Sequence, residues 1–167
     1  MFVKTYAGAV VGIDAVEVTV EVNLTSGIGL YLVGLPDNAV KESEERIRSA
    51  FENCGERFSG KKIVVNLAPA DLRKEGSGFD LPIAVAILGA MDRVVCEKLS
   101  STLFLGELSL DGSLRGVKGV LPVVVKARER GLKRVVVPKE NALEASVVSG
   151  IEVLGVEHLK QVIEWLL

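Results

Sequence analysis

The sequence has few of the residues that usually mark a metal centre, a disulfide scaffold or a nucleic-acid coat. It contains one histidine, His158, and two cysteines, Cys54 and Cys96, without a CxxC pair, so no zinc site or other metal site is expected. Each cysteine follows apolar residues, which predicts two lone buried thiols in a reducing, cytoplasmic compartment. The formal net charge of −2 argues against a chain built mainly to coat nucleic acid, although local basic patches remain compatible with it.

Long hydrophobic runs and a secretory leader are also missing. The longest apolar run, residues 83–91, is far shorter than the ~20 residues that a membrane span requires. The first residues lack the basic start, apolar stretch and small-residue cleavage site of a signal peptide. The sequence therefore predicts no membrane partner.

What the chain does have is enough apolar sequence for one globular domain over residues 1–167, with 49% hydrophobic residues. Valines alternate with polar residues over 16–24, which is typical of a strand with one buried face. The pattern starts with strands and continues with βα units, which predicts an α+β or mixed α/β sandwich of sheet and helices. Strands are expected near 2–11, 16–24, 28–33 (covered on both faces), 63–67, 102–110, 134–137 and 151–154, and helices near 38–54, 79–91, 121–127, 140–148 and 159–166. Asp37 is expected to cap the helix near 38–54, and Asp111–Gly112 to form a tight turn. The pairs Glu42–Arg46 and Glu44–Arg48 are four residues apart on that helix and are interpreted as a solvated face.

One stretch, Gly55–Lys62, nearly matches the phosphate-binding pattern GxxxxGK[ST]. Lys62 stands where the pattern needs a hydroxyl for Mg²⁺. The expected helix precedes this stretch and a strand follows it, which is the reverse of a true phosphate-binding loop. We therefore interpret it as a plain connection with a basic edge.

The glycine-rich segment 73–80 opens the most apolar of the expected helices and holds the first candidate for chemistry. Ser77 lies near the helix start, and Lys118 follows a strand in another glycine turn, so a Ser–Lys dyad is one hypothesis. The alternative from the same residues is a helix-capping serine and an ordinary surface lysine.

A basic surface is the second candidate. If the loops that carry the lysines and arginines of this surface share one edge of the molecule, these basic side chains would contact phosphates. The alternative is that the same side chains form a solvated rim. The candidate nucleic-acid contacts are Lys61, Lys62, Arg73, Lys74, Arg115 and Lys118.

Four segments together resemble the N-terminal domain of the magnesium-chelatase-related AAA+ proteins, the competence protein ComM (YifB) group. The resemblance runs from Tyr6 to the C-terminus. The segments are VGLPD at 33–37, VKESEERIRSA at 40–50, VNLAPADLRKEGSGFDLPIA at 65–84 and FLGELSLDG at 104–112.

The resemblance implies a fold like that of the Lon protease domain and a place in a longer protein. A AAA+ ATPase domain, which would bind ATP and magnesium, is expected beyond Leu167, and this domain needs no cofactor of its own. The expected role is branch migration of DNA in natural transformation, as part of a hexameric helicase. The domain by itself is then no enzyme, and its partners are its own AAA+ domain, the sister subunits and DNA.

The Lon comparison also bears on catalysis. The protease nucleophile lies in the motif Lys-Asp-Gly-Pro-Ser-Ala-Gly; placing this motif on Lys74 puts Ser77 at the proline and Gly78 at the serine. Lys118 falls where the protease lysine would be. A lysine without its serine cannot acylate, so we expect no catalytic residue here. A shift of the motif by one position would place Ser77 at the nucleophile, so a Ser77–Lys118 hydrolase is the second hypothesis. The third hypothesis is a purely structural domain, which predicts an exposed apolar patch.

Overall fold

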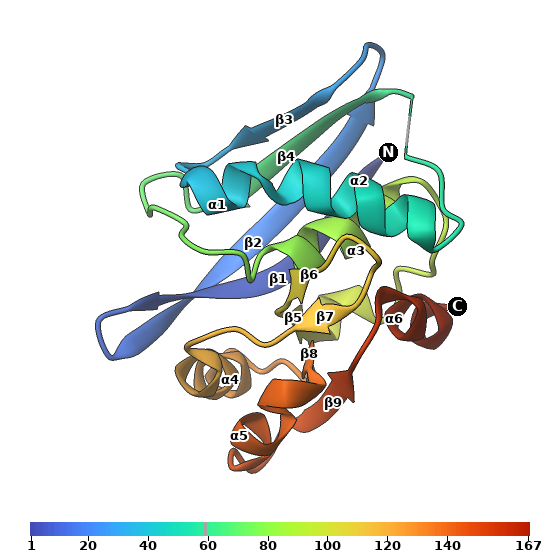
Figure 1. Cartoon of the computed structure of the whole chain (residues 1–167). Coiled ribbons are helices and arrows are strands. Elements are labelled where there is room, and N and C mark those ends of the chain that lie inside the picture. The colour runs from blue at the N-terminus through green and yellow to red at the C-terminus, as the bar shows by residue number, and fades with distance from the viewer. Residues whose placement is uncertain (59) are drawn as a thin grey trace.

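A seven-stranded mixed sheet forms the centre of the computed structural model, which describes residues 1–58 and 60–167 (Figure 1). The pairs β1–β2 and β2–β4 are antiparallel, and the other neighbours are parallel, so the mixed α/β class is as predicted. The strands lie in the order β3 (Leu30–Val33), β4 (Lys62–Ala68), β2 (Asp14–Thr25), β1 (Phe2–Val11), β5 (Thr102–Phe104), β8 (Arg134–Pro138) and β9 (Glu152–Val156).

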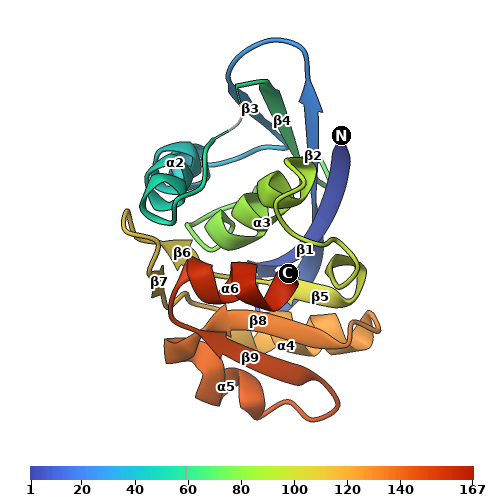
Figure 2. The ribbon, with the colours of Figure 1, turned by 90° about the vertical axis from the view of Figure 1, so that its right-hand side faces the viewer.

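Helices cover both faces of this sheet (Figure 2). One core cluster lies between the sheet and α2, α3 and α6, and the other packs α4 and α5 against β5 and β8. A short ribbon, β6 (Glu107–Leu108) and β7 (Leu114–Arg115), stands outside the main sheet. The helices are α1 (Asn38–Lys41), α2 (Ser43–Asn53), α3 (Asp80–Ala90), α4 (Val120–Glu129), α5 (Ala142–Ser146) and α6 (Leu159–Leu166), with 3-10 turns η1 (Leu99–Ser101) and η2 (Lys139–Asn141).

Helix α3 is buried along its whole length, as its apolar composition predicts. Burial reaches its first residue, Asp80, although a carboxylate is costly to remove from water without partners. Thr5 of β1 ties the first turn to the sheet, because its hydroxyl donates to the Pro82 carbonyl at 2.8 Å. The core of the domain is therefore built around a helix that carries one buried charge.

The strand at 28–33 differs from its prediction. It was expected to be covered on both faces, but β3 lies at the edge of the sheet and pairs only with β4. Tyr31 and Val33 are about half exposed, at 51% and 48%. Short apolar runs look alike in buried and edge strands, and only the sheet order separates them.

The expected single strand at 102–110 is also divided. Strand β5 ends at Phe104: the Leu105 amide still donates to the Val136 carbonyl of β8, but the Gly106 amide donates to the Gly78 carbonyl of the glycine-rich loop. The turn predicted at Asp111–Gly112 is present: Gly112 has φ 95°, and the Ser109 amide donates to the Ser113 carbonyl at 2.8 Å.

The remaining predictions of local structure have mixed outcomes. Asp37 caps the helix that follows it, accepting from the Val40 amide at 2.8 Å, and His158 caps α6. Both cysteines are free, but Cys96 is exposed and Cys54 half-buried, so the prediction of two buried thiols is wrong.

The stretch Gly55–Lys62 joins α2 to β4, and its Ser59 lies outside the described residues. Within the described part of the chain, no helix is both long and apolar enough to cross a bilayer.

Candidate functional site

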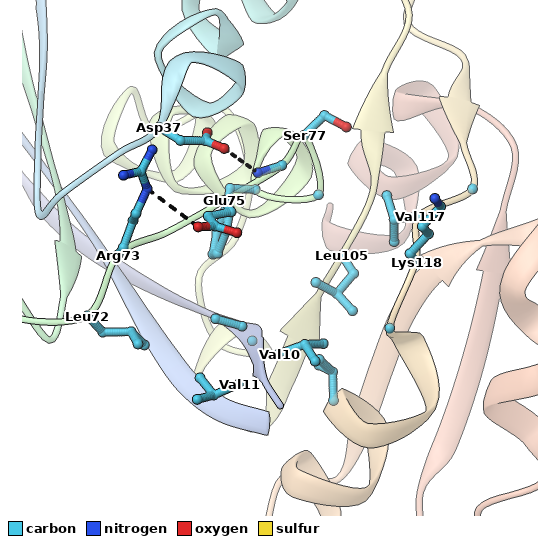
Figure 3. Close-up of a pocket in the computed structure, with 18 residues that line it drawn as sticks. Val10, Val11, Asp37, Leu72, Arg73, Glu75, Ser77, Leu105, Val117 and Lys118 are labelled. Atoms are coloured by element: carbon cyan, nitrogen blue, oxygen red, sulfur yellow. Dashed lines mark hydrogen bonds and ion pairs between the residues drawn. The ribbon is translucent and has the colours of Figure 1, made fainter. Parts of the chain in front are cut away.

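The segments that carry the family resemblance meet at the start of α3. The loop before α3 pairs with residues 35–37: the Lys74 amide donates to the Leu35 carbonyl at 3.0 Å, and the Asp37 amide donates to the Lys74 carbonyl at 2.9 Å. The Asp37 carboxylate also accepts from the Gly76 amide at 3.0 Å (Figure 3). Asp37 therefore caps α1 with one oxygen and holds the glycine-rich loop with the other.

The segment at 104–112 closes the other side of this loop. The Gly106 amide donates to the Gly78 carbonyl, and the Leu81 amide donates to the Gly106 carbonyl, both at 3.1 Å. The Leu108 amide donates to the Asp80 carboxylate at 3.0 Å. These bonds fix the loop and the first turn of α3 between two segments that are distant in sequence.

A buried ion pair links α2 to this junction. The Asp80 carboxylate, 0% exposed, accepts from Arg46 Nε at 2.6 Å and Nη2 at 3.0 Å, and from the Ser43 hydroxyl at 2.5 Å. Burial raises the pKa of Asp80, and the hydrogen bonds from Arg46 and Ser43 oppose that rise. The same hydrogen bond to Asp80 raises the pKa of Arg46.

The sequence predicted only part of the role of Arg46. The pair with Glu42 expected from their spacing is present at 4.0 Å, but Arg46 does not lie on a solvated face, because it turns inward to Asp80. The matching prediction for Arg48 is confirmed by its 2.8 Å contact with Glu44. The available signal was Asp80 itself, because a charge at the head of an otherwise apolar helix requires a buried partner.

Lys74 was predicted to contact nucleic acid, and its position contradicts that role. Its side chain is 0% exposed, and its ammonium donates to the Gly34 carbonyl at 2.8 Å and to the Pro69 carbonyl. Desolvation by burial lowers the pKa of Lys74. Lys74 thus joins the end of β3 to the loop that follows β4, and phosphate cannot reach it.

A cavity of about 860 Å³ opens beside the glycine-rich loop. Figure 3 shows Arg73 and Lys118 on opposite sides of it, with Ser77 above and the tip of the β1–β2 hairpin below. Its walls are mostly apolar. The lining residues are Gly8, Ala9, Val10, Val11, Asp37, Leu72, Arg73, Glu75, Gly76, Ser77, Gly78, Phe79, Leu105, Gly116, Val117, Lys118, Gly119 and Val123.

Ser77 and Lys118 line the same cavity, but the structure engages them differently. The Ser77 hydroxyl donates to the Glu107 carboxylate. Lys118 is exposed and, among the described residues, makes no hydrogen bond or ion pair. Gly78, which the motif comparison is expected to place at the protease nucleophile, carries no hydroxyl.

Two of the six predicted basic contacts, Lys61 and Lys62, lie at the start of β4 and outside the cavity wall. Lys62 begins β4, whereas Arg73 follows the end of this strand, which spans roughly 20 Å. The Lys62 ammonium lies 5.1 Å from the centre of the Tyr31 ring. Lys61 precedes Lys62 and is exposed.

The basic side chains nearer the cavity are mostly paired. Arg73 lies 3.4 Å from Glu75. Arg115 lies 3.8 Å from Glu107 and donates to the Ser109 hydroxyl at 2.8 Å. Within residues 1–58 and 60–167, no group of three or more histidine, cysteine, aspartate or glutamate side chains is placed to hold a metal ion.

Comparison with known proteins defines the class to which this fold and site belong. Residues 20–141 match the family model described as subunit ChlI of Mg-chelatase, and the chain belongs to this family. The match includes the glycine-rich loop, α3 and most of the cavity wall.

Individual relatives are similar over nearly the whole chain. An uncharacterized protein of Mycobacterium tuberculosis is 46% identical over 164 residues, which are 98% of this chain and 33% of that protein. The competence protein ComM of Haemophilus influenzae is 44% identical over 162 residues, 96% of this chain and 32% of ComM. The chain therefore spans about a third of the length of these curated relatives.

A weaker match connects the chain to proteases. Lon protease 2 of Bacillus subtilis is 26% identical over 128 residues, which are 76% of this chain and 23% of the protease. This match agrees with the expected Lon-like architecture of mixed sheet and helices.

Proposed function

We propose that this chain is the non-catalytic N-terminal part of a ComM-like, magnesium-chelatase-related AAA+ ATPase that acts on DNA. The observation that supports the absence of catalysis is the pair of positions at the head of α3. Gly78 has no nucleophile, and the Ser77 hydroxyl donates to the Glu107 carboxylate instead of to the Lys118 amine that a Ser–Lys dyad requires. In this proposal ATP and magnesium bind in the AAA+ region of the longer protein, which assembles as a hexameric cytoplasmic helicase for branch migration.

A serine-reactive probe tests the non-catalytic part of the proposal. A fluorophosphonate is expected to leave the chain unlabelled, because Ser77 of the cavity wall makes no hydrogen bond to Lys118, the amine of the expected dyad. Labelling that disappears in both Ser77→Ala and Lys118→Met would establish the hydrolase and end the proposal. Labelling that persists in Ser77→Ala would point to another serine and would also refute it.

Contact with DNA is the second part of the proposed function. The exposed cations of the cavity wall, Arg73 and Lys118, are its best support. Anisotropy of labelled single-stranded and duplex oligonucleotides at rising salt measures it, since each phosphate contact adds about 0.7–0.9 to the logarithmic salt slope. Lys118→Gln should reduce the slope by about one contact, whereas Lys133→Gln, on an exposed lysine outside the cavity, should not. Absence of binding at low salt would remove the DNA contact.

A role in ring assembly has support from a different surface. Among the described strands, β3 has a neighbour on one side only, and its residues Tyr31 and Val33 are about half exposed, as is Leu35 just beyond its end. Exposed apolar side chains on an open strand edge are typical of a surface that packs against another domain or subunit. Amide exchange of β3 should be slower in the longer protein than in this chain; equal exchange rates would count against such packing.

A further inference from the structure

One face of the sheet is open over four of its strands. The strands β3, β4, β2 and β1 lie side by side (Figure 1), and every second side chain of each points away from the core. These side chains are exposed or half-buried, whereas their neighbours in sequence, such as Val3, Val22 and Val65, form the core on the other face. The register aligns the outward side chains in two rows across the strands, Phe2–Asn23–Val64–Tyr31 and Lys4–Glu21–Asn66–Val33.

Helix α4 covers only one end of this face. Gly8 lies against Val123 of α4, and Ala15 belongs to the core cluster that α4 helps to form. The apolar members of the two rows belong to neither core cluster of the described residues. Phe2 and Tyr31, at opposite ends of one row, are 55% and 51% exposed. Two aromatic rings are thus held at the surface about 14 Å apart, which is the width of three strand spacings.

The polar side chains of the rows set a cation near each end of this face. The Lys62 ammonium lies 5.1 Å from the centre of the Tyr31 ring. At the other end, Lys4 makes no hydrogen bond or ion pair among the described residues. Glu21 stands between Lys4 and Asn66 in its row and accepts from the Asn66 amide at 2.8 Å. The face therefore presents exposed rings and cations, a combination that complements bases and phosphates.

A cavity of about 330 Å³ continues this face beyond β1. Its walls are mostly apolar, and its volume lies within the range of small-ligand pockets. The outward side chains of Phe2, Lys4 and Tyr6 form its wall on β1. A flat aromatic group such as a nucleobase matches this lining. The lining residues are Met1, Phe2, Val3, Lys4, Tyr6, Cys96, Leu99 and Ser100.

We propose that this open face binds single-stranded nucleic acid, with bases stacked on Phe2 and Tyr31 and phosphates held by Lys4 and Lys62. The nucleic acid crosses the four β-strands, and the base beyond Phe2 enters the cavity next to Tyr6. Exposed rings on a four-stranded sheet recognise single strands with little dependence on sequence, because every base has a face that stacks. The inference rests on the proposed function, since it adds a surface and a preference for single strands to the DNA contact.

The same face fits tight packing against another domain less well. Its centre holds Asn23, Glu21 and Asn66, whereas the core of a protein interface is depleted in charged side chains. Tyr31 also lies at the β3 edge that is proposed above for ring assembly. The longer protein therefore forms a separate arm of the test.

Photo-crosslinking of the 167-residue chain locates the bound strand. The probe is a thymidine dodecamer with 5-iodouracil at alternate positions, within the ~4–16 nucleotides that single-strand sites occupy. Irradiation joins an iodinated base to an aromatic ring on which it stacks. We expect crosslinks at Phe2 or Tyr31, mapped by mass spectrometry of a digest, and few crosslinks when the oligonucleotide is annealed to its complement. Crosslinks confined to residues 73–80 or 116–119 would place the strand in the other cavity and overturn the proposal.

Anisotropy of the labelled dodecamer separates stacking from charge. Tyr31→Ala and Phe2→Ala should each weaken binding about fivefold or more, and Tyr31→Phe should bind like the parent because it keeps the ring. Leu143→Ala, which removes an exposed apolar side chain of α5, should change nothing. Lys4→Gln should lower the logarithmic salt slope by about 0.7, the share of one phosphate on a single strand.

The outcomes distinguish this inference from the proposed function. Binding that depends on Lys118 but not on Phe2 or Tyr31 would reject the stacking face and leave the DNA contact standing. Equal affinity for the duplex, with equal losses in the alanine variants, would refute base stacking. Loss of the Tyr31 crosslink in the longer protein would show that another domain or subunit covers the face, and the proposal would fail. No binding of either oligonucleotide at low salt would remove both the face and the DNA contact.

Discussion

The buried ion pair between Arg46 and Asp80 gives the sharpest test of how the site is held together. Arg46 supplies the cation and two of the hydrogen bonds to a carboxylate that is 0% exposed; Ser43 and the Leu108 amide supply the others. Arg46→Met keeps much of the volume but leaves this carboxylate without a counter-charge. Breaking a buried pair in this way costs about 3–5 kcal/mol, a large part of the ~5–15 kcal/mol that stabilises a typical domain.

The pH dependence of this loss has a defined sign. Burial already raises the pKa of Asp80 in the folded chain, and removal of the guanidinium raises it further. A carboxyl with a raised folded-state pKa stabilises the fold fully only below its unfolded pKa, about 3.9, and this contribution is lost as pH rises through the folded-state value. The destabilisation of Arg46→Met relative to the parent should therefore be larger at pH 8 than at pH 5.

Urea unfolding monitored by circular dichroism at the two pH values measures this loss. Arg48→Met on the same helix is the control: its pair with Glu44 is partly exposed, so about 0.3–1 kcal/mol is expected. The double change Arg46→Met with Asp80→Leu should recover at least ~2 kcal/mol, because no buried charge remains unpaired. A loss below ~1 kcal/mol for Arg46→Met, or one independent of pH, would refute the reasoning.

The remaining predictions concern Lys74 and two glycines. Lys74→Met should cost about 1–3 kcal/mol in the free energy of unfolding, because the Gly34 and Pro69 carbonyls lose their donor, and should leave any DNA-binding salt slope unchanged; a reduced slope would contradict its burial. Gly34→Ala should prevent stable folding by thermal melts, since φ is 108° and the new Cβ would be 2.2 Å from the Leu67 carbonyl oxygen. Gly78→Ser should melt close to the parent, within about 1 kcal/mol, because a Cβ there meets Val117 at 3.6 Å; a collapse of stability would refute the assigned space.

Much of the fold was predictable because its signals are local. The alternating valines of 16–24 require a strand with one buried face, and β2 has that pattern. The uniformly apolar stretch after Gly78 predicts a buried helix, and α3 is one. Asp37 was predicted to cap a helix from its type and position, and it does so.

The site was less predictable because its roles depend on partners distant in sequence. Arg46 and Lys74 look like surface cations by composition, yet both turn inward to acceptors that lie 34 and 40 residues away. No local rule distinguishes them from Arg48 or Lys118, which remain at the surface.

By itself the sequence determined the order of strands and helices, the buried character of α3 and the absence of a serine at position 78. Periodicity, capping residues and side-chain identity are properties of neighbouring positions, and they act before the chain is compact. Only the tertiary structure decided which charges are buried, which strand lies at the edge and which residues line the cavity. Those outcomes depend on desolvation and pairing between distant segments, which exist only once the sheet has assembled.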